Sequence, residues 1–553
     1  MKENGILYSD NVKKAEILND QFKSVFSKDD PSEPHPLPNP EFPKIQDINI
    51  TEPGVRKLLQ NLKPNKASGP DNISPLILKT LAPEIAPSLT LIFQKSYETS
   101  EVPEDWRTAN VSPIFKKGEK YTAANYRPVS LTCICSKLME HIITSHILKH
   151  SNENNILYNL QHGFRPKLSC ETQLVEFVHD ISKNMVSGTQ TDVIVMDFSK
   201  AFDKVSHKKL SQKLHHYGIV GKTHSWINAF LTNRTQKVVV NGDSSSSVLV
   251  ASGVPQGSVL GPSLFLFYIN NMPDNIKSTV RLFADDTIIY IALKPNTNNS
   301  ILQEDLDKLA SWEKNWKMEF HPQKCQVIHI TKNRNKIKNT YTLNGHTLES
   351  ADNAKYLGVT ITSDLSWNQH IDNITKKANK TLGFVRRNVK TSSQNIKTQA
   401  YFTLVRPILE YASPVWNPHT KNNINKIEMV QRRAARYVCN RYHNTSSVTN
   451  MIHSLGWRSL QARRVDAKLV LFYKIVNGLV AIPISTYLTP VIRKDSTFHN
   501  TQAFLTYTTT IDYFMHSFFP STIKLWNHLP ENIVSLPNLD TYKTQVQSLP
   551  QIF

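Results

Sequence analysis

The spacing of apolar residues follows a helical period in some segments and a strand period in others, which predicts a mixed helix and sheet protein. Between Asp10 and Ser27 apolar residues recur every three or four positions, as in an amphipathic helix, and Asp10 is a suitable N-cap. Six prolines then fall within residues 31–43 and predict an extended linker. We therefore expect a boundary between structural units at residues 30–48.

Two further helices are predicted after this linker. Thr51 is placed to cap the first of them, which we expect to end near Lys63. Ser74 is placed to begin the second, and Pro83 and Pro87 are expected to interrupt it. This part of the chain should therefore consist of helices with loops between them.

Strands and helices alternate from about residue 191. The apolar residues 193–196 predict a buried strand that leads into Asp197. Residues 237–240 predict a second strand, which ends at the turn-forming pair at 241–242 (Asn-Gly). The change from a purely helical period marks the start of a region that contains a sheet.

The clearest hairpin signal lies further along the chain. Residues 280–284 (VRLFA) and 287–291 (TIIYI) are mostly apolar, and they flank Asp285 and Asp286 as a predicted two-residue turn. After about residue 370 the pattern becomes helical and basic. We therefore expect the sheet to end before the C-terminal third begins.

The net charge of the chain indicates the class of its partner. The 553 residues carry a formal net charge of +20, which would draw the chain toward a polyanion such as nucleic acid. Between His370 and Lys474, 19 Lys and Arg residues minus 4 acidic residues give a net +15, whereas the first 50 residues are net negative. The C-terminal third is therefore expected to contain the main phosphate-binding surface.

Cysteine usage and hydropathy indicate the compartment. Five scattered cysteines are too few for a disulfide framework, and their odd number suits a reducing environment. No apolar run reaches the roughly 20 residues that a membrane span needs, and the N-terminus has no signal-peptide pattern. We expect an intracellular protein of the nucleus and cytoplasm, without a membrane segment.

Aspartates at predicted strand ends are the main candidates for catalysis. Asp197 ends one apolar strand, and Asp285 and Asp286 stand at the hairpin 88 residues later. A single aspartate at a strand end is usually a cap or turn residue, but two adjacent carboxylates repel each other and need a cation or solvent. Carboxylates are ligands that Mg²⁺ prefers, and two such ions can clamp the attacking and leaving oxygens of phosphoryl transfer.

Seven short blocks occur in one order along the chain. Three of them are residues 197–203 (DFSKAFD), 253–262 (GVPQGSVLGP) and 283–286 (FADD). The others are residues 66–71 (KASGPD), 125–131 (NYRPVSL), 161–165 (QHGFR) and 355–359 (KYLGV). Together they resemble the reverse transcriptases of non-LTR retrotransposons, in particular the jockey-like LINE elements, with the first three resembling the palm motifs. Each block alone is weak evidence, but the ordered set is specific.

The resemblance implies an RNA-directed DNA polymerase with an α+β, right-hand polymerase fold. The implied reaction is attack of a primer 3′-hydroxyl on the α-phosphate of a deoxynucleotide, with two Mg²⁺ ions for which Mn²⁺ can substitute. The implied partners are an RNA template, a DNA primer and deoxynucleoside triphosphates. The implied segments are residues 1–48 as an N-terminal helix and Pro-rich linker, 49–190 as fingers with part of the palm, 191–365 as the palm, 366–420 as a helical thumb and 421–553 as a basic helical C-terminal extension.

Carried over by position, the palm motifs supply the metal ligands and a steric gate. Asp197 and Asp285 would bind both metals, with Asp286 in support and the Phe198 carbonyl completing one coordination shell. Phe202 would pack where a ribose 2′-hydroxyl would lie, and the alternative is that its ring belongs to the core. RNA-dependent RNA polymerases generally have a polar residue at that position.

The resemblance also implies a set of nucleotide-binding residues. Lys116, Lys117 and Arg127 would hold the triphosphate on the fingers, unless the lysines belong to a solvated basic loop. Gln256 and Gly257 would lie against the nucleotide. Cationic contacts of this kind neutralise charge that spreads over the phosphate oxygens in the transition state.

One block departs from the family pattern. Members of the family often have Asn-Pro-x-Lys downstream of the hairpin, whereas residues 321–324 read His-Pro-Gln-Lys. Lys324 is retained, and it would protonate the leaving pyrophosphate. A plain surface lysine is an equally good interpretation.

The basic C-terminal region contains one clear amphipathic helix. Its apolar positions between Ile424 and Val438 share one arc. Four basic residues lie on the opposite side: Lys426, Arg432, Arg433 and Arg436. We expect this face to contact duplex phosphates, and the alternative is a solvated charged face.

Three other points bear on the interpretation. Full-length jockey-like proteins resemble a fusion with an endonuclease, and about 50 residues before the first block leave no room for that domain. A catalytically inactive nucleic-acid-binding relic of such an element is the main alternative function. An intron maturase is disfavoured because its C-terminal nuclease signature is missing.

Overall fold

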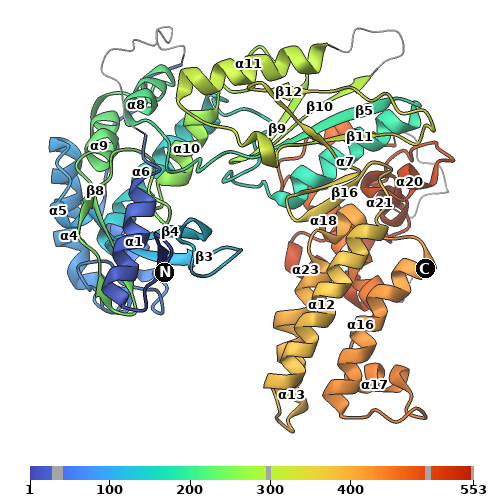
Figure 1. The fold of residues 1–553 in the computed structure, drawn as a ribbon. Coiled ribbons are helices and arrows are strands. Elements are labelled where there is room, and N and C mark those ends of the chain that lie inside the picture. Colours follow the sequence, from blue (N-terminus) through green and yellow to red (C-terminus); the bar gives the residue numbers. More distant parts are fainter. Residues whose placement is uncertain (28–41, 294–299, 492–499, 550–553) are drawn as a thin grey trace. The chain divides into compact units, whose positions relative to one another are not determined.

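The computed structural model describes residues 1–27, 42–293, 300–491 and 500–549 (Figure 1). Contacts between residues divide the chain into two compact units, each built from three stretches. The first unit comprises residues 1–164, 197–276 and 305–321, and the second comprises residues 165–196, 277–304 and 322–553. Most of the predicted proline-rich linker lies outside the described residues, and the five contiguous segments proposed from the sequence stay a prediction.

The first unit contains a five-stranded sheet in the order β4-β3-β6-β7, with β8 also on β6. Its strands are β3 (Thr108–Phe115), β4 (Tyr126–Leu131), β6 (Thr235–Val240), β7 (Asp243–Ser244) and β8 (Val248–Leu249), with a separate pair β1 (Lys2–Glu3) and β2 (Ile6–Leu7). Its helices are α1 (Asn11–Lys23), α2 (Glu52–Gln60), α3 (Pro75–Thr80), α4 (Ala82–Thr99), α5 (Glu104–Arg107), η1 (Ala123–Asn125), α6 (Ile134–Glu153), α8 (His207–His216), α9 (Gly221–Leu231) and α10 (Gly261–Ile269). The predicted strand at residues 237–240 and its Asn-Gly turn are confirmed.

Helix α1 confirms the first predicted helix and its cap. The Asp10 carboxylate accepts the backbone N–H of Lys13 at 2.7 Å. The buried side chains of Leu18 and Phe22 pack toward β3 and β6. The helix ends at Lys23, so the prediction that it reaches residue 27 is wrong in its last turn.

Helices α2 to α4 depart from the prediction at their ends. Thr51 is the N-cap residue of α2, as predicted, but its side chain makes no capping hydrogen bond, and the helix stops at Gln60 rather than near Lys63. The break between α3 and α4 falls at Leu81, so Pro83 lies in the first turn of α4 and Pro87 lies inside that helix. A proline inside a helix removes one backbone hydrogen bond. The helix continues through Pro87 because burial of its apolar face, which includes Phe93, outweighs that loss.

The second unit contains a five-stranded sheet in the order β14-β11-β5-β10-β9. Its strands are β5 (Gln190–Met196), β9 (Thr279–Phe283), β10 (Asp286–Leu293), β11 (Gln326–Ile330), β12 (Thr342–Leu343), β13 (His346–Thr347), β14 (Glu349–Ser350), β15 (Asn353–Tyr356) and β16 (Val359–Thr362). Helix α11 (Ile301–Trp316) begins in this unit and continues in the first. The predicted strand at residues 193–196 is confirmed as the second half of β5.

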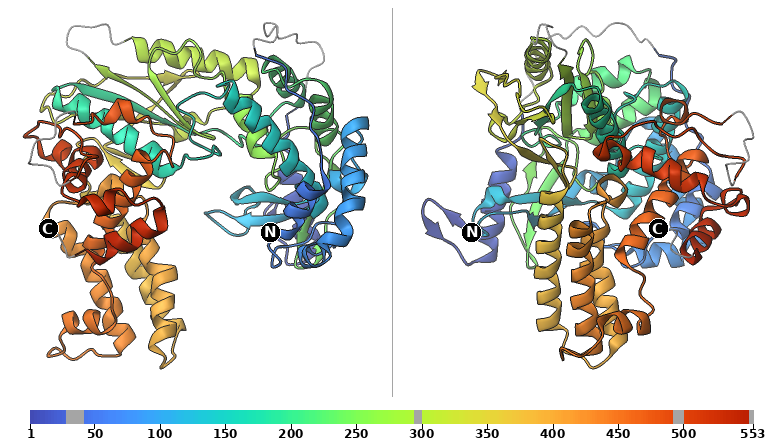
Figure 2. Two further views of the ribbon diagram at one scale, coloured as in Figure 1. Left: turned by 180° about the vertical axis from the view of Figure 1, so that it is seen from behind. Right: turned by 90° about the vertical axis from the view of Figure 1, so that its right-hand side faces the viewer.

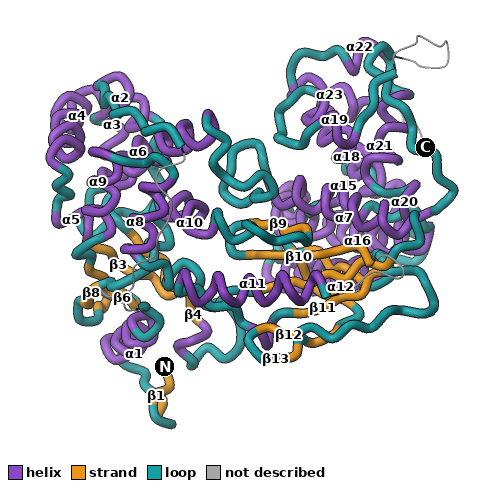
Figure 3. The backbone as a smooth tube through the Cα atoms, turned by 90° about the horizontal axis from the view of Figure 1, so that it is seen from above, coloured by secondary structure: helices purple, strands orange, loops and turns teal. Residues whose placement is uncertain are grey.

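Helix α7 (Cys170–Val186) lies against this sheet, as Figure 3 shows from above. Its buried Phe177 contacts Tyr290 of β10 and Tyr356 of β15, with ring centroids 5.4 Å and 5.8 Å apart. Val193 of β5 belongs to the same apolar cluster. The central strands are therefore buried between layers, which explains why residues 193–196 of β5 are apolar.

The rest of the second unit is helical, as predicted. The elements are η2 (Pro322–Lys324), α12 (Asn368–Asn388), α13 (Gln394–Ala400), the π-helix η3 (Tyr401–Val405), α14 (Arg406–Glu410), α15 (Ser413–Trp416), α16 (Lys421–Cys439), α17 (Val448–Ser454), α18 (Leu460–Val476), α19 (Ile484–Tyr487), α20 (Asp512–Met515), α21 (Phe518–Asn527), α22 (Glu531–Val534) and α23 (Leu539–Ser548). Helices α12 and α16 run side by side in both orientations of Figure 2.

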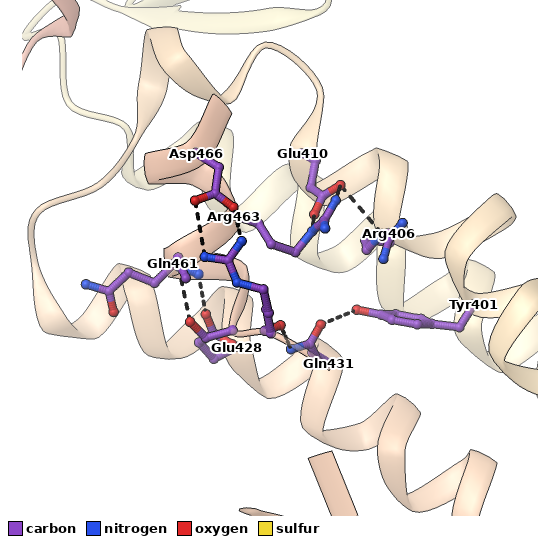
Figure 4. Close-up of polar contacts among 11 residues, drawn as sticks. Tyr401, Arg406, Glu410, Glu428, Gln431, Gln461, Arg463 and Asp466 are labelled. Atoms are coloured by element: carbon purple, nitrogen blue, oxygen red, sulfur yellow. Dashed lines mark hydrogen bonds and ion pairs between the residues drawn. The ribbon is translucent and has the colours of Figure 1, made fainter. Parts of the chain in front are cut away.

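Polar contacts join α14, α16 and α18 (Figure 4). Glu410 of α14 accepts two hydrogen bonds from the guanidinium of Arg463 on α18 and lies 3.6 Å from that of Arg406. Glu428 of α16 accepts the backbone N–H of Gln461 at 2.7 Å. These contacts attach α16 to the start of α18, and α18 to α14.

Three features of the chain as a whole can be compared with the sequence analysis. The fold is mixed helix and sheet, as predicted. None of the described helices is long and apolar enough to cross a membrane. The five cysteines form no disulfide.

Candidate active site

The two adjacent aspartates lie at the hairpin between β9 and β10 in the second unit. Phe283 pairs with Asp286, so the turn residues are Ala284 and Asp285 rather than the predicted Asp285 and Asp286. Ala284 has a φ of +55°, the left-handed conformation that tight hairpin turns require. The hairpin is confirmed, and its predicted register is wrong by one residue.

The acidic residues adjoin the paired ends of β5 and β10. Met196, the last residue of β5, lies opposite Thr287. Asp197 directly follows Met196, and Asp286 directly precedes Thr287. Asp197 and Asp285 are half-buried, and Asp286 is exposed.

The three aspartates are divided between the two units. Asp197 belongs to the first unit, and Asp285 and Asp286 belong to the second. Within the described residues, no three His, Cys, Asp or Glu side chains are grouped closely enough to hold a metal ion. Carboxylate oxygens are nevertheless the hard donors that Mg²⁺ takes, so the residue types fit. The metal site stays a prediction.

A buried cluster of charges anchors the acidic hairpin to α7. Arg281 of β9 is 3% exposed and forms ion pairs of 2.7 Å with both Glu176 and Asp180 of α7. Its Nε also donates to the Tyr290 hydroxyl of β10 at 2.8 Å. Burial raises the pKa of Glu176, and the nearby Arg281 charge opposes that rise. One cation therefore holds both hairpin strands in place.

The chain beyond Asp197 is held by a neighbouring segment of the first unit. The Asp197 carbonyl accepts the backbone N–H of His321 at 2.8 Å. Phe198 forms a β-bridge with Phe320, and their rings stack with centroids 4.4 Å apart. The phenyl ring of Phe198 is thus a core group, while the proposed role of its carbonyl as a metal ligand stays a prediction.

Phe202, the candidate gate, is half-buried five residues after Asp197. Its ring stacks on the buried Phe265 of α10, with centroids 4.4 Å apart and planes at 15°. The Phe202 carbonyl accepts the backbone N–H of Val254 at 2.9 Å. The loop that contains Gln256 is therefore attached directly to the gate.

Gln256 is held by two further contacts. Its side-chain amide donates to the carboxylate of Asp203 at 2.8 Å, and its carbonyl accepts the backbone N–H of Ser130 at 2.7 Å. Gly257 has a φ of +112°, and a Cβ there would lie 2.6 Å from the Ser130 carbonyl. Gly253 likewise has no room for a Cβ, because the carbonyls of residues 202 and 203 lie 2.8 Å from its position. This explains the glycines on either side of Gln256.

The predicted triphosphate-binding residues lie on the hairpin of β3 and β4. Lys116 and Lys117 are exposed just beyond β3, and Arg127 is exposed on β4 opposite Ile114. Burial raises the pKa of Asp203, and the charges of its neighbours, Arg127 among them, oppose that rise. Arg127, Asp203 and Gln256 therefore share one electrostatic neighbourhood. Lys324 is exposed in the second unit, in η2.

Two buried acids of this site were missed from the sequence. Asp203 was treated only as part of a motif, although it orients Gln256. Glu140 of α6 is fully buried, and its carboxylate accepts the backbone N–H groups of Val259 and Leu260 at 2.7 Å and 3.1 Å. Burial raises the pKa of Glu140. An acid among the mainly apolar residues of the buried face of α6 was the available signal.

The predicted basic face of α16 is confirmed as a pattern, and several of its charges have partners on neighbouring segments. Lys426 forms a 2.8 Å ion pair with Asp372 of α12. The remaining contacts are Arg432 to Thr449 at 3.5 Å, Arg433 to Asn379 at 3.0 Å and Arg436 to the His443 carbonyl at 3.3 Å. None of the three arginines has a carboxylate partner among these contacts, so their charge remains available to a polyanion.

Comparison with known proteins finds a match to one protein family within the chain. Residues 114–361 match the family model described as reverse transcriptase (RNA-dependent DNA polymerase). This range includes all three palm motifs and the β3–β4 hairpin beyond residue 114.

Curated relatives match over a longer stretch. The RNA-directed DNA polymerase from mobile element jockey of Drosophila melanogaster is 30% identical over 70% of this chain and 44% of its own length. The probable RNA-directed DNA polymerase from transposon BS of the same species is 28% identical over 71% of this chain and 45% of its own length. The jockey protein of Drosophila funebris is 28% identical over 70% of this chain and 44% of its own length. The chain thus spans less than half the length of these relatives.

Proposed function

We propose that the chain is the RNA-directed DNA polymerase of a non-LTR retrotransposon, because residues 114–361 match the reverse transcriptase family model and the chain is similar to the jockey polymerase. Its substrates are an RNA template, a DNA primer and deoxynucleoside triphosphates. The observation that carries the proposal is the joint presence, in family order, of the strand-end Asp197, the locked Gln256 loop and the acidic hairpin. A right-hand arrangement of fingers, palm and thumb is part of the proposal.

The aspartates are proposed to hold two Mg²⁺ ions. Asp197 and Asp285 would be shared ligands, with Asp286 and the Phe198 carbonyl as additional donors. When bound, these ions lower the charge on the reacting phosphate and activate the primer hydroxyl. The anchored hairpin keeps Asp285 and Asp286 at a fixed place, which such a site requires.

The remaining residues of the site bind and orient the nucleotide. Arg127, with Lys116 and Lys117, is proposed to neutralise the triphosphate, and its charge already acts on the neighbourhood of Gln256. The Gln256 amide cannot turn freely, because Asp203 accepts from it. Its position beside the Phe202 loop suits contact with the sugar and the template base. Lys324 as a proton donor is retained as a lesser proposal.

Duplex binding is proposed for the outer face of α16. Glu428 and Gln431 of this helix bond to Gln461 and Arg458 (Figure 4). Arg432, Arg433 and Arg436 contact other segments, through groups that carry no charge. A basic helix face of this kind fits the phosphate backbone of a template and primer.

A primer-extension assay with the purified chain tests the function. An RNA template annealed to a DNA primer, with deoxynucleotides and Mg²⁺, should give template-length DNA. Binding of the same duplex without any extension, in Mg²⁺ and in Mn²⁺, would contradict the proposal and favour an inactive nucleic-acid-binding relic. Extension only with ribonucleotides would contradict the choice of substrate.

A further inference from the structure

Phe164 combines an unfavourable backbone conformation with an exposed, apolar side chain. Its φ is +53°, in the left-handed region that disfavours residues with a large side chain. The side chain is 51% exposed, so burial in a core does not account for phenylalanine at this position. Strained residues that the surrounding structure holds in place occur preferentially at functional sites.

The turn before Phe164 is fixed by a buried neighbour. Gln161 is 2% exposed, and its side-chain oxygen accepts the backbone N–H of Gly163 at 2.8 Å. His162 is 2% exposed as well. The turn is thus anchored on one side, and Phe164 projects from it in a defined position.

The exposed ring of Phe164 lies against the candidate gate. Its centroid is 6.2 Å from that of Phe202, and the planes meet at 81°, an edge-to-face contact. Phe202 in turn stacks on the fully buried Phe265. Phe202 therefore has two aromatic neighbours, Phe265 stacked on its ring and Phe164 edge-to-face with it, and all three rings belong to the first unit.

We propose that Phe164 is a positioning residue for sugar selection. Its ring limits the movement of Phe202 on the side not covered by Phe265, so that a ribose 2′-hydroxyl meets a fixed ring. Without this contact Phe202 could rotate away and admit a ribonucleotide. The inference rests on the proposed polymerase function, and it assigns a role to the block at residues 161–165 that the palm motifs do not supply.

Backbone strain makes a clean test possible with a glycine variant. Phe164→Gly removes the ring and suits a positive φ, so the unfolding temperature should not fall. Phe164→Tyr keeps the ring and should keep the parental selectivity. Leu91→Ala, which truncates a side chain that is 67% exposed elsewhere in the same unit, is the matched control for loss of an exposed apolar group.

The measurement is the ratio of kcat/KM for a deoxynucleotide to that for its ribonucleotide in single-nucleotide extension on an RNA template. We expect Phe164→Gly to lower this ratio roughly tenfold, mainly through a lower ribonucleotide KM, with Phe164→Tyr and Leu91→Ala unchanged. A ratio within about twofold of the parent for Phe164→Gly, while Phe202→Val relaxes selection, would overturn the inference and leave the polymerase intact.

Two other results are decisive. A lower unfolding temperature for Phe164→Gly would show that the ring serves stability rather than selection, and would also overturn the inference. A parent chain that extends no primer would overturn both the inference and the proposed function, so the two failures are distinguishable.

Discussion

Replacing Arg281 by methionine is expected to loosen the hairpin that carries Asp285 and Asp286. Arg281 is buried between the hairpin and α7, with ion pairs to Glu176 and Asp180. Methionine has a similar reach but no charge and no donor. The substitution would leave the Glu176 carboxylate, whose side chain is 4% exposed, without its cation.

The size of the loss follows from the burial of the partners. Breaking a buried ion pair by removing one member costs about 3–5 kcal/mol, because an uncompensated charge stays in the interior. Asp180 adds less, since its side chain is 31% exposed and reaches water. Burial already raises the pKa of Glu176, and loss of Arg281 would raise it further. Protonation of Glu176 then relieves the unpaired charge, so the loss should be smaller at pH 5 than at pH 8.

Hydrogen exchange of the peptide from residue 279 to residue 293, combined with urea unfolding at both pH values, measures this effect. Lys426→Met is the control, because it breaks a pair whose side chains are 37% and 42% exposed and should cost below about 1 kcal/mol. Adding Glu176→Leu to Arg281→Met should restore part of the stability. A cost for Arg281→Met no greater than that of the control would refute the assignment of this cluster as the anchor of the hairpin.

Three further predictions concern other parts of the chain. Glu140→Leu should cost about 2–4 kcal/mol, because two backbone N–H groups at the start of α10 lose their acceptor, and thermal unfolding together with the nucleotide KM checks this. Burial lowers the pKa of His179 to about 4, so the unfolded chain takes up a proton below about pH 6.5 that the folded protein does not bind. The free energy of unfolding should therefore fall by up to about 3 kcal/mol between pH 6.5 and 4, and His179→Phe should remove this loss. The measurement is the difference between the unfolding midpoints at pH 7 and pH 4.5, which should be smaller in the variant. Replacing Arg432, Arg433 and Arg436 by glutamine should make the salt dependence of duplex binding shallower by close to one unit of slope for each lost phosphate contact, and an unchanged slope would show that the duplex runs elsewhere.

Much of the fold could be predicted from patterns within a few neighbouring residues. The Asp10 cap and the buried spacing of α1 are contained within a few residues, and they are confirmed. The hairpin at the paired aspartates was visible for the same reason. Its register was predicted wrongly because Ala284 adopts a left-handed conformation, which an alanine does not indicate in a sequence. The continuation of α4 through Pro87 was missed because packing of the helix outweighed local preference.

Contacts between distant residues account for most of what the sequence did not show. The hydrogen bond between Gln256 and Asp203 joins positions 53 residues apart, and that between Glu140 and Val259 joins positions 119 residues apart. No periodicity encodes such pairs. The sequence therefore predicted the helix and basic pattern of α16, but it did not reveal what holds Gln256 or that Lys426 is paired.

Catalysis by the strand-end aspartates is tested most directly by extension and binding measured on the same variants. Asp197→Asn and Asp285→Asn should each abolish primer extension on an RNA template while leaving duplex affinity close to that of the parent, because each removes metal-binding charge but no basic surface. Asp243→Asn, an exposed aspartate of β7 outside the proposed site, should retain parental extension and serves as the matched control. Extension by either site variant within roughly tenfold of the parent, with binding intact, would contradict the two-metal assignment.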